Sequence, residues 1–424
     1  MINNIIITNI PLNTSRGSVT RTVSAIYDDN GCVSLNIHNT SSIIGNIYLG
    51  RVDNIVKNIN SAFVSIDKNN TCYYSLTDNK KHYFFNPKNN TAVNQGDSIL
   101  VQVKKDATKL KPASLSDKIE LPGHYVVISL DVKGVVVSKK IKDTDTIIEL
   151  RHSLQDLLDS QSECEDFCNY GINPGIIVRS NAASLTDIEP AVKEAKDLIQ
   201  SLSLLIHNAI YQKAPVCLYE ALPEYINIIN DMPLSELGQV ITDDSEIFGQ
   251  ISQRCSYISD NPDSCIRLYS DEMLPLYNLY DVRKEIEKAL SRKIWLKSGG
   301  YIIIDYTEAM TVIDVNSGKY VTKKHDAQAK ENAFYLVNSQ AATEIARQLR
   351  LRNISGMVIV DFINMENPEH IQGILKILKD EFKKDSVTTS VVDITKLGLV
   401  EITRKRAGAM LKECLNGEAA GNEL

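Results

Sequence analysis

The first half of this chain is marked by short runs in which apolar and polar residues alternate. Residues 44–120 contain several, such as SAFVSI, TCYYSL and DSILVQVKKD, separated by clusters of Asn, Gly and Lys. This alternation is typical of β-strands with one buried face. About five short strands in a segment of this length favour a small closed sheet. We therefore predict a β-barrel over residues 44–120.

Strands and helices alternate over residues 280–410. Apolar strand-like runs (YIIID, TVIDV, MVIVDFI and SVVDI) are separated by segments of helical spacing near residues 329–352 and 368–384, which predicts an α/β domain. The other segments are assigned from the same patterns: residues 1–43 β-rich, residues 121–214 strands and a long helix that begins near Pro190, residues 215–279 mixed α/β, and residues 411–424 a disordered tail. The fold class is therefore multidomain α/β with a β-barrel.

Composition narrows the class of protein. A length of 424 residues favours two to four domains, and the net charge of −7 argues against a uniformly basic surface while allowing a local basic groove. The eight cysteines are scattered and lack the spacing typical of zinc sites. We find no signal peptide and no apolar run near the ~18 residues that span a bilayer. We expect a cytoplasmic protein with reduced thiols.

Two aspartates interrupt strand-like runs. Asp314 lies in TVIDVN and Asp361 in MVIVDFINM, and we expect Asp361 to lie in a buried strand. A buried carboxylate is costly unless it is paired or coordinates a metal. Asn316 follows Asp314 by two residues and shares its face of the strand. Oxygen ligands of this kind suit Mg²⁺. The alternative is that each Asp caps a helix or a turn.

Basic residues flank these acidic strands in the sequence. RQLRLR places Arg347 and Arg350 on one face of the expected helix, and ITRKRAG adds a second run. Such runs are often solvated faces, but their position near the aspartates also suits a phosphate-binding rim.

Aromatic and basic residues also occur in and after the predicted barrel. Phe63 and Tyr73 lie on neighbouring expected strands, and Lys109 and Lys111 follow the barrel strands. This combination suits stacking of single-stranded bases, with packing in the barrel core as the alternative.

Two further pairs of residues follow expected strands in residues 121–214. Arg179 and Ser180 end GIIVRS, and Lys139 and Lys140 follow GVVVS. An Arg beside a hydroxyl at a strand end is suited to gripping a terminal phosphate.

Together these segments resemble the ribonuclease E/G family of bacterial endoribonucleases. The resemblance covers nearly the whole chain and is strongest in GNIYLGRV with SAFVSI, IWLKSGGYIIIDYTEAMTVIDVNSGK, EIARQLRLRNISGMVIVDFINM and LGLVEITRKR. It implies an S1 RNA-binding barrel (residues 44–120) inserted in an RNase H-like subdomain (residues 1–43 and 215–279). It also implies a 5′-sensor subdomain (residues 121–214) and a DNase I-like catalytic domain (residues 280–410).

The resemblance further implies roles for the candidate residues. Asp314 and Asp361 would hold one Mg²⁺, and Asn316 would orient a carboxylate or the substrate. The expected reaction is cleavage of single-stranded, A/U-rich RNA to 5′-phosphate and 3′-hydroxyl ends, in rRNA and tRNA processing and mRNA decay.

The RNA-contact positions of the family correspond to residues outside this catalytic set. They are Phe63, Tyr73 and Lys111 in the barrel, and Arg179 and Ser180 where the family has an Arg-Thr pair for a 5′-monophosphate. Lys139 and Lys140 stand where the family has arginines, which gives up bidentate geometry.

One departure concerns zinc. The best-known family members carry a CPxC pair that shares a zinc ion between two chains, whereas only Cys414 lies in that region here. We expect no zinc link, because one thiol from each of two chains falls short of four ligands. A homodimer through other surfaces stays open. This sequence contains no long scaffold tail of the kind that E-type members carry, so we expect a protein closer to the G-type.

Two competing hypotheses are a non-catalytic RNA-binding protein and a DNA nuclease. The complete set of Asp314, Asn316 and Asp361 argues against the first. The second rests only on the core fold, and a core fold alone does not decide the substrate. The predicted barrel favours RNA over DNA.

Overall fold

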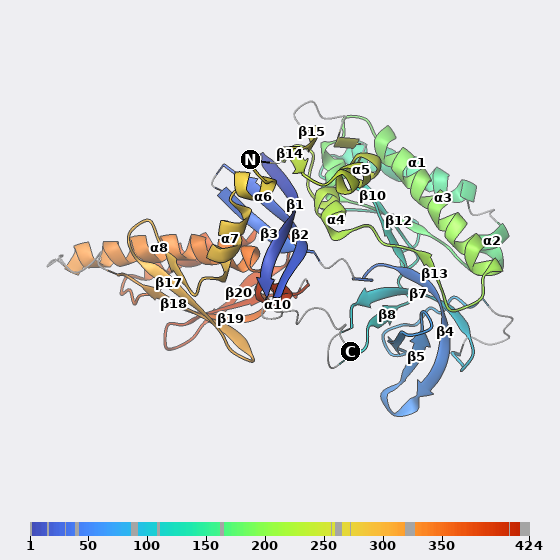
Figure 1. Ribbon diagram of the computed structural model, residues 1–424, viewed down its shortest axis with the longest axis horizontal. Coiled ribbons are helices and arrows are strands. Elements are labelled where there is room, and N and C mark those ends of the chain that lie inside the picture. The colour runs from blue at the N-terminus through green and yellow to red at the C-terminus, as the bar shows by residue number, and fades with distance from the viewer. Residues whose placement is uncertain are drawn as a thin grey trace. The chain divides into compact units, whose positions relative to one another are not determined.

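The computed structural model divides into two compact units, which we describe separately (Figure 1). Unit 1 comprises residues 1–39, 238–250 and 265–419, and unit 2 comprises residues 40–237, 251–264 and 420–424. The structure describes residues 2–14, 17–29, 31–38, 42–85, 92–107, 111–161, 165–255, 257–258, 265–271, 273–318, 327–406 and 408–415.

A six-stranded sheet in the order β16-β17-β18-β19-β21-β20 forms the larger part of unit 1. Its strands are β16 (Lys293–Trp295), β17 (Tyr301–Tyr306), β18 (Met310–Asn316), β19 (Gly356–Asp361), β20 (Thr389–Ile394) and β21 (Val400–Arg404). Only the β18–β19 pair of this sheet is parallel. The strands predicted from YIIID, TVIDV, MVIVDFI and SVVDI are thus confirmed.

Helices α8 (Ala327–Leu351) and α9 (Pro368–Phe382) pack against one face of this sheet, close to their predicted ranges. Asn367 caps α9 by accepting a hydrogen bond from the Glu369 N–H, and Pro368 occupies the first turn, where its missing N–H costs nothing. The buried strand positions, such as Ile302, Ile313 and Val360, face these helices.

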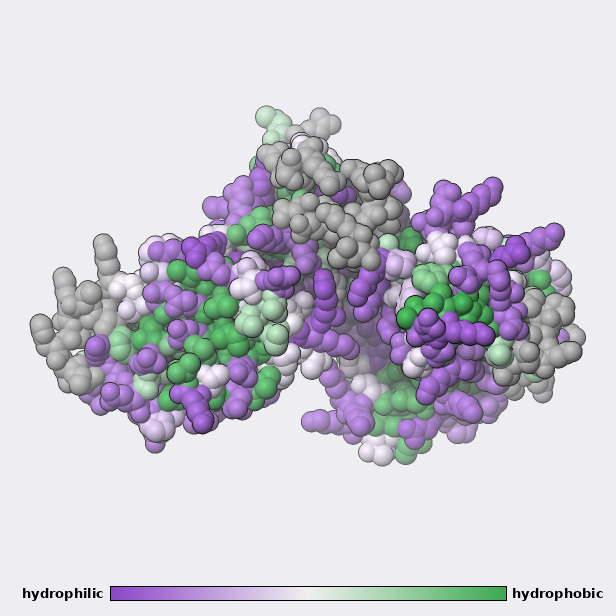
Figure 2. All heavy atoms as spheres, turned by 90° about the horizontal axis from the view of Figure 1, so that it is seen from below, coloured by the Kyte–Doolittle hydropathy of each residue, from purple (hydrophilic) through white to green (hydrophobic). Residues whose placement is uncertain are grey.

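The alternate positions of the same strands form what we call the open face. These side chains are half-buried or exposed in β17, β18 and β19. Figure 2 shows hydrophobic residues, in green, gathered among polar ones over this part of unit 1, at the left of the view. Asp361 lies on the open face and is exposed, so the expectation that it is buried is wrong. Successive side chains of a strand point to opposite faces of the sheet. Val360 is on the buried face, so Asp361 projects to the other one.

Unit 1 also contains a five-stranded sheet in the order β15-β14-β1-β2-β3. Its strands are β1 (Asn3–Thr14), β2 (Gly17–Asp28), β3 (Gly31–Ile37), β14 (Leu237–Thr242) and β15 (Cys265–Leu268), accompanied by helices α6 (Leu276–Leu279), α7 (Val282–Leu290) and α10 (Leu411–Leu415). Its core joins strand residues such as Ile6 and Val23 to Ile286 of α7 and Leu411 of α10. Of the predicted tail, residues 411–415 are therefore helical, and residues 416–424 lie outside the described part. Helix α5 (Ser245–Arg254) follows β14.

The predicted barrel is present in unit 2. Strands β4 (Ile47–Val56), β5 (Ser61–Ser65), β6 (Thr71–Ser75), β8 (Ser114–Ser116) and β7 (Ser98–Lys105) pair in this order, and β4 also pairs with β7. These pairings close a five-stranded barrel that is compatible with an OB fold. The short helix η1 (Lys57–Ile59) joins β4 to β5, and β13 (Val216–Tyr219) extends the sheet beside β4.

The rest of unit 2 is a four-stranded sheet with helices. The sheet has the order β11-β12-β10-β9, with β9 (Glu120–Pro122), β10 (Val126–Ser129), β11 (Val135–Val137) and β12 (Gly175–Val178). The helices are α1 (Thr144–Gln161), α2 (Glu165–Asn169), η2 (Ser180–Ser184), α3 (Glu189–Tyr211) and α4 (Glu224–Asp231). Helix α3 begins next to the predicted Pro190 and buries Ala195, Ile199 and Leu202. The predicted domain boundaries stay predictions.

Candidate active site

Asp314 and Asp361 lie directly opposite each other on adjacent strands. They are Cα partners in the parallel register of β18 and β19, at the ends of both strands. Both side chains are exposed, while their neighbours Ile313 and Val360 are buried. Adjacent strands are about 4.8 Å apart, so the two carboxylates share one small area of the open face. The structure therefore brings together the two aspartates predicted from sequence.

Asn316 completes this group. Its Nδ2 donates a hydrogen bond of 2.6 Å to Oδ2 of Asp314. The chain after Asn316 packs closely on the Gly299–Gly300 turn: a Cβ at Gly318 would lie 2.4 Å from the carbonyl oxygen of Gly299. Gly318 also has φ +58°, a conformation that favours glycine. The glycines of KSGG and NSG thus fix the backbone that carries Asn316.

Asn338 of α8 fixes the chain that follows Asp361. This fully buried side chain donates to the carbonyl oxygen of Ile363 (2.8 Å) and accepts from the Ile363 N–H (3.1 Å). Ile363 is two residues beyond Asp361, so the paired hydrogen bonds anchor the exit of β19 to the helix. Our sequence reasoning did not identify Asn338. In the sequence, Asn338 could have been noticed only as a polar residue among the apolar positions of the expected helix.

Arg347 and Arg350 both bind protein acceptors. Arg347 forms an ion pair with Glu344 (3.1 Å) and donates to the carbonyl oxygen of Cys32 on β3 (2.7 Å). Arg350 donates to the carbonyl oxygen of Glu381 (3.1 Å). These contacts tie α8 to β3 and to α9. RNA contact by either residue stays a prediction.

Each basic run also contains an arginine in the core. Arg352 is 2% exposed and donates to Gln348 (2.6 Å), and Arg404 pairs with Asp385, both side chains being 3% exposed. Buried charges need such partners. The sequence interpretations of these runs, a solvated face or a phosphate-binding rim, are both wrong for Arg352 and Arg404.

In the barrel, Phe63 of β5 and Tyr73 of β6 are directly opposite each other, with ring centroids 6.3 Å apart in an edge-to-face arrangement. Both are half-buried. Ala62 and Val64 belong to the barrel core, so Phe63 projects to the other face of β5. Lys111 is exposed, two residues before Ala113, whose carbonyl oxygen accepts from the Tyr73 N–H. Lys109 lies outside the described residues.

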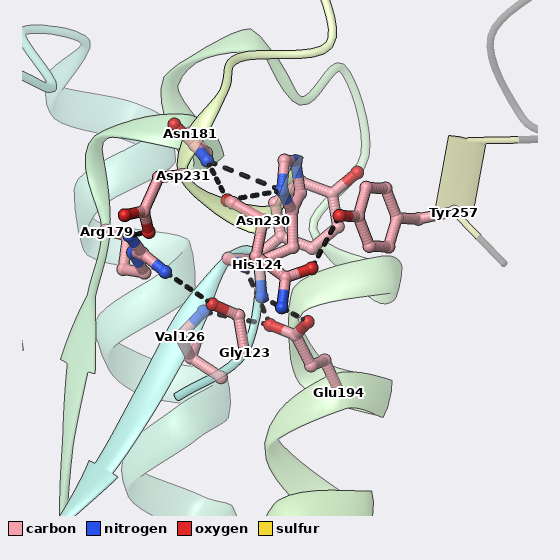
Figure 3. Close-up of polar contacts among 10 residues, drawn as sticks. Gly123, His124, Val126, Arg179, Asn181, Glu194, Asn230, Asp231 and Tyr257 are labelled. Atoms are coloured by element: carbon pink, nitrogen blue, oxygen red, sulfur yellow. Dashed lines mark hydrogen bonds and ion pairs between the residues drawn. The ribbon is translucent and has the colours of Figure 1, made fainter. Parts of the chain in front are cut away.

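The candidate 5′-phosphate residues follow two paired strands of unit 2. β11 and β12 are parallel, with Val137 opposite Val178, so Lys139–Lys140 and Arg179–Ser180 follow the same edge of the sheet. Both lysines are exposed. Arg179 donates to the carbonyl oxygen of Gly123 (2.7 Å) and to the carboxylate of Asp231 (Figure 3).

A buried polar network supports the loop beside Arg179 (Figure 3). Glu194 of α3 accepts hydrogen bonds from the N–H groups of His124, Tyr125 and Val126 at 2.7 to 2.9 Å, and burial raises the pKa of its carboxyl. A Cβ at Gly123 would lie 2.5 Å from the Glu194 carboxyl carbon, so a larger residue there would displace the carboxylate from these hydrogen bonds. The backbone that receives the Arg179 hydrogen bond is therefore fixed by α3.

His124 is the most enclosed member of this network. It is 1% exposed, its Nδ1 lies 2.9 Å from the carbonyl oxygen of Asn230, and its ring stacks on Tyr257 at 4.1 Å. Burial lowers the pKa of His124 to about 4. Sequence reasoning missed this residue and Glu194, because neither lies in a motif.

A family model named Ribonuclease E/G family matches residues 120–407. The chain belongs to the ribonuclease E/G family. It is 32% identical over 386 residues to Ribonuclease G of Escherichia coli (strain K12), an alignment that covers 89% of this chain and 75% of that protein. This result confirms the resemblance found in the sequence.

Other family relatives match this chain at similar sequence identity. Ribonuclease E of Synechocystis sp. (strain ATCC 27184 / PCC 6803 / Kazusa) is 31% identical over 396 residues, covering 92% of this chain and 56% of that protein. Ribonuclease E/G-like protein of Pyropia yezoensis is 32% identical over 389 residues, covering 89% and 72%.

The described residues hold no preformed cluster of metal ligands. No group of three or more His, Cys, Asp or Glu side chains in the described ranges is arranged to hold a metal ion. A magnesium site needs fewer protein ligands, since one or two carboxylates with water and substrate phosphate suffice.

Within the described ranges, none of the helices combines the length and apolar character needed to cross a membrane. Cys414 lies in α10 and is half-buried.

Proposed function

We propose that this protein is a Mg²⁺-dependent endoribonuclease that cleaves single-stranded, A/U-rich RNA to 5′-phosphate and 3′-hydroxyl ends. Membership in the ribonuclease E/G family supports the endoribonuclease part. The observation that carries the metal-dependent part is the opposed pair of Asp314 and Asp361, with Asn316 bonded to Asp314. We place its role in rRNA and tRNA processing and mRNA decay, in the cytoplasm.

The donor set fits a magnesium ion. Asp314 and Asp361 offer carboxylate oxygens from adjacent strands on an exposed surface, which leaves room for water and a phosphate. When bound, the ion would act as a Lewis acid toward the scissile phosphate and lower the pKa of a coordinated water. The hydrogen bond from Asn316 directs one oxygen of Asp314 and leaves the other for the ion.

The reaction needs no protein nucleophile. A water oxygen attacks the phosphorus, the bond between phosphorus and the 3′ oxygen breaks, and a proton goes to that oxygen. The products are the 3′-hydroxyl and the 5′-phosphate. The protein residues bind and orient: Asp314 and Asp361 would hold the metal, and Asn316 keeps Asp314 in position through its hydrogen bond.

Binding of the substrate is assigned to other residues. Phe63 and Tyr73 would stack bases on the outside of the barrel, and Lys111 would contact the backbone. Arg179 and Ser180, with Lys139 and Lys140 at the same sheet edge, would receive a 5′-monophosphate. Any homodimer would form through other surfaces, without a zinc bridge.

A cleavage assay tests the proposal. A short, 5′-monophosphorylated, A/U-rich RNA is incubated with wild type and with Asp314→Asn, with Mg²⁺ or with excess chelator, and the product ends are mapped. Asp305→Asn is a matched control, because Asp305 lies on β17 in an exposed ion pair with Arg292. We expect internal cuts with 5′-phosphates in wild type and in the control only. Preferential cutting of a matched DNA would contradict the assignment of RNA as the substrate. If wild type binds the RNA in Mg²⁺ without cutting it, the protein is a non-catalytic RNA-binding protein.

A further inference from the structure

An aromatic pair continues the active-site row across the six-stranded sheet. Trp295 on the edge strand β16 is the Cα partner of Tyr301 on β17, and Tyr301 is the Cα partner of Asn316 on β18. Directly opposed residues project to the same face of a sheet. Trp295, Tyr301 and Asn316 therefore form one row on the open face, at the end of the sheet that carries Asp314 and Asp361.

The geometry of this pair leaves it available to a ligand. The ring centroids of Trp295 and Tyr301 are 5.3 Å apart, with the planes at 64°. The Nζ of Lys293 lies 4.0 Å from the Trp295 ring centroid and 3.6 Å from that of Tyr301. Trp295 is 64% exposed. A ring that served only to pack β16 on β17 would lose more of its surface to the fold, since a Trp is usually mostly buried.

The charges on the open face identify the kind of ligand. Asp314, Asp361, Glu401 and Asp393 make its centre and far edge acidic. Lys293 places a cation at the β16 edge, held on the aromatic rings by cation–π attraction. A flat π-system with a cation beside it suits a nucleobase and its phosphate, the combination that single-stranded nucleic acids find on stacking platforms.

The distance to the carboxylates fits a strand that is being cut. Trp295 lies two strands from Asp314 and three from Asp361, with both carboxylates two residues further along the sheet, so the distances are about 12 Å and 16 Å. At about 3.4 Å per stacked nucleotide, these lengths correspond to at most about five nucleotides. A base on Trp295 would therefore belong to the same RNA segment as the scissile phosphate.

We propose that Trp295, Tyr301 and Lys293 form a stacking platform that binds one base of the RNA within about five nucleotides of the cleaved bond. This inference rests on the proposed endoribonuclease function and adds a position-determining contact to it. The platform fixes which phosphate reaches Asp314 and Asp361. It recognises the π-face of a base and the adjacent phosphate, so it tolerates different bases.

Fluorescence gives a direct test, because Trp295 is the single tryptophan of the chain. The full-length protein is titrated with a short, single-stranded, dye-labelled RNA in excess chelator, and binding is followed by anisotropy of the dye. We expect the tryptophan emission to be quenched along the same binding curve. Saturable binding with unchanged tryptophan emission would overturn the platform.

A cleavage experiment separates the platform from the proposed function. Wild type and Trp295→Ala are compared on an intact RNA and on a series in which one nucleotide near the cut is abasic. Trp295→Phe keeps a stacking ring, and Met357→Ala is the matched control. Met357 is an apolar residue of the open face, 54% exposed, at the opposite end of β19 from Asp361.

The expected result is a non-additive loss. One abasic position lowers kcat/KM of wild type on the order of tenfold, Trp295→Ala loses about as much on intact RNA, and the two losses do not add. Trp295→Phe and Met357→Ala stay close to wild type. Additive losses, or a Trp295→Ala variant that cuts normally but changes oligomeric state, would overturn the platform while the endoribonuclease stands. A wild type that cuts no RNA would overturn the proposed function itself.

Discussion

The carboxylate of Asp231 accepts a hydrogen bond from the guanidinium group of Arg179, the residue proposed to hold a 5′-monophosphate (Figure 3). The Asp231 side chain is 62% exposed and that of Arg179 is 24% exposed. A negative charge therefore already lies on the proposed anion-binding group. A phosphate at Arg179 would bind against the repulsion of Asp231.

Replacing Asp231 with Asn tests this relationship. The amide keeps an oxygen that accepts from Arg179 and removes the charge, so KM for 5′-monophosphorylated RNA should fall about fivefold, the effect of about 1 kcal/mol between exposed charges. KM for 5′-hydroxyl RNA should not change. In an Arg179→Ala background, the same replacement should have no effect. Equal changes for both RNAs would show that Asp231 only supports the fold.

Replacing Asp361 with Asn should lower cleavage by about two orders of magnitude or more, because a carboxylate that binds the metal loses its charge. RNA binding, measured by anisotropy, should stay close to wild type. Asp305→Asn should cut normally. If Asp361→Asn cuts as fast as wild type, Asp361 does not belong to the active site.

Replacing Asn338 with Ala should affect both stability and cleavage. It leaves the N–H and carbonyl groups of Ile363 without their partners, which costs about 1–3 kcal/mol of unfolding free energy. The exit of β19 next to Asp361 also loses its anchor, so kcat should fall more than the folded fraction does. Ser339→Ala is the control, because that hydroxyl bonds to the carbonyl of Tyr335 within α8. A loss of stability with unchanged kcat would limit Asn338 to a structural role.

His124 should make unit 2 sensitive to acid. Burial lowers its pKa from 6.5 to about 4, so between these values the unfolded chain binds a proton that the folded chain does not. The free energy of unfolding should therefore fall as the pH drops from 6.5 to 4, by about 3 kcal/mol in total. The raised pKa of Glu194 acts in the opposite sense, because its contribution to stability is lost as the pH rises through that pKa.

The measurement is urea unfolding at pH 7, 6, 5 and 4 for wild type and His124→Asn. The Asn side chain can still donate to the carbonyl of Asn230 and does not titrate. The variant should lose most of the fall in stability between pH 6.5 and 4. An unchanged pH profile would assign the acid sensitivity to other groups.

Local patterns were sufficient for much of the fold. Alternation predicted the barrel strands, and helical spacing predicted α8 and α9 to within two residues of their bounds. Asp314, Asn316 and Asp361 were found because polar residues in apolar strands are conspicuous. The assumption that Asp361 is buried failed, since a run of apolar residues does not reveal which face of a strand is covered.

The sequence by itself determined the family, the elements and the identity of the three candidate active-site residues, because each depends on residues close together in the chain. Only the tertiary structure decided that Asp314 and Asp361 are opposed, since strand register depends on pairing between segments far apart in sequence. It also decided that Arg347 and Arg350 bind protein carbonyls and that Trp295 lies in line with Asn316. Those contacts depend on which surfaces pack together, and a charge or ring in the sequence does not specify its neighbour.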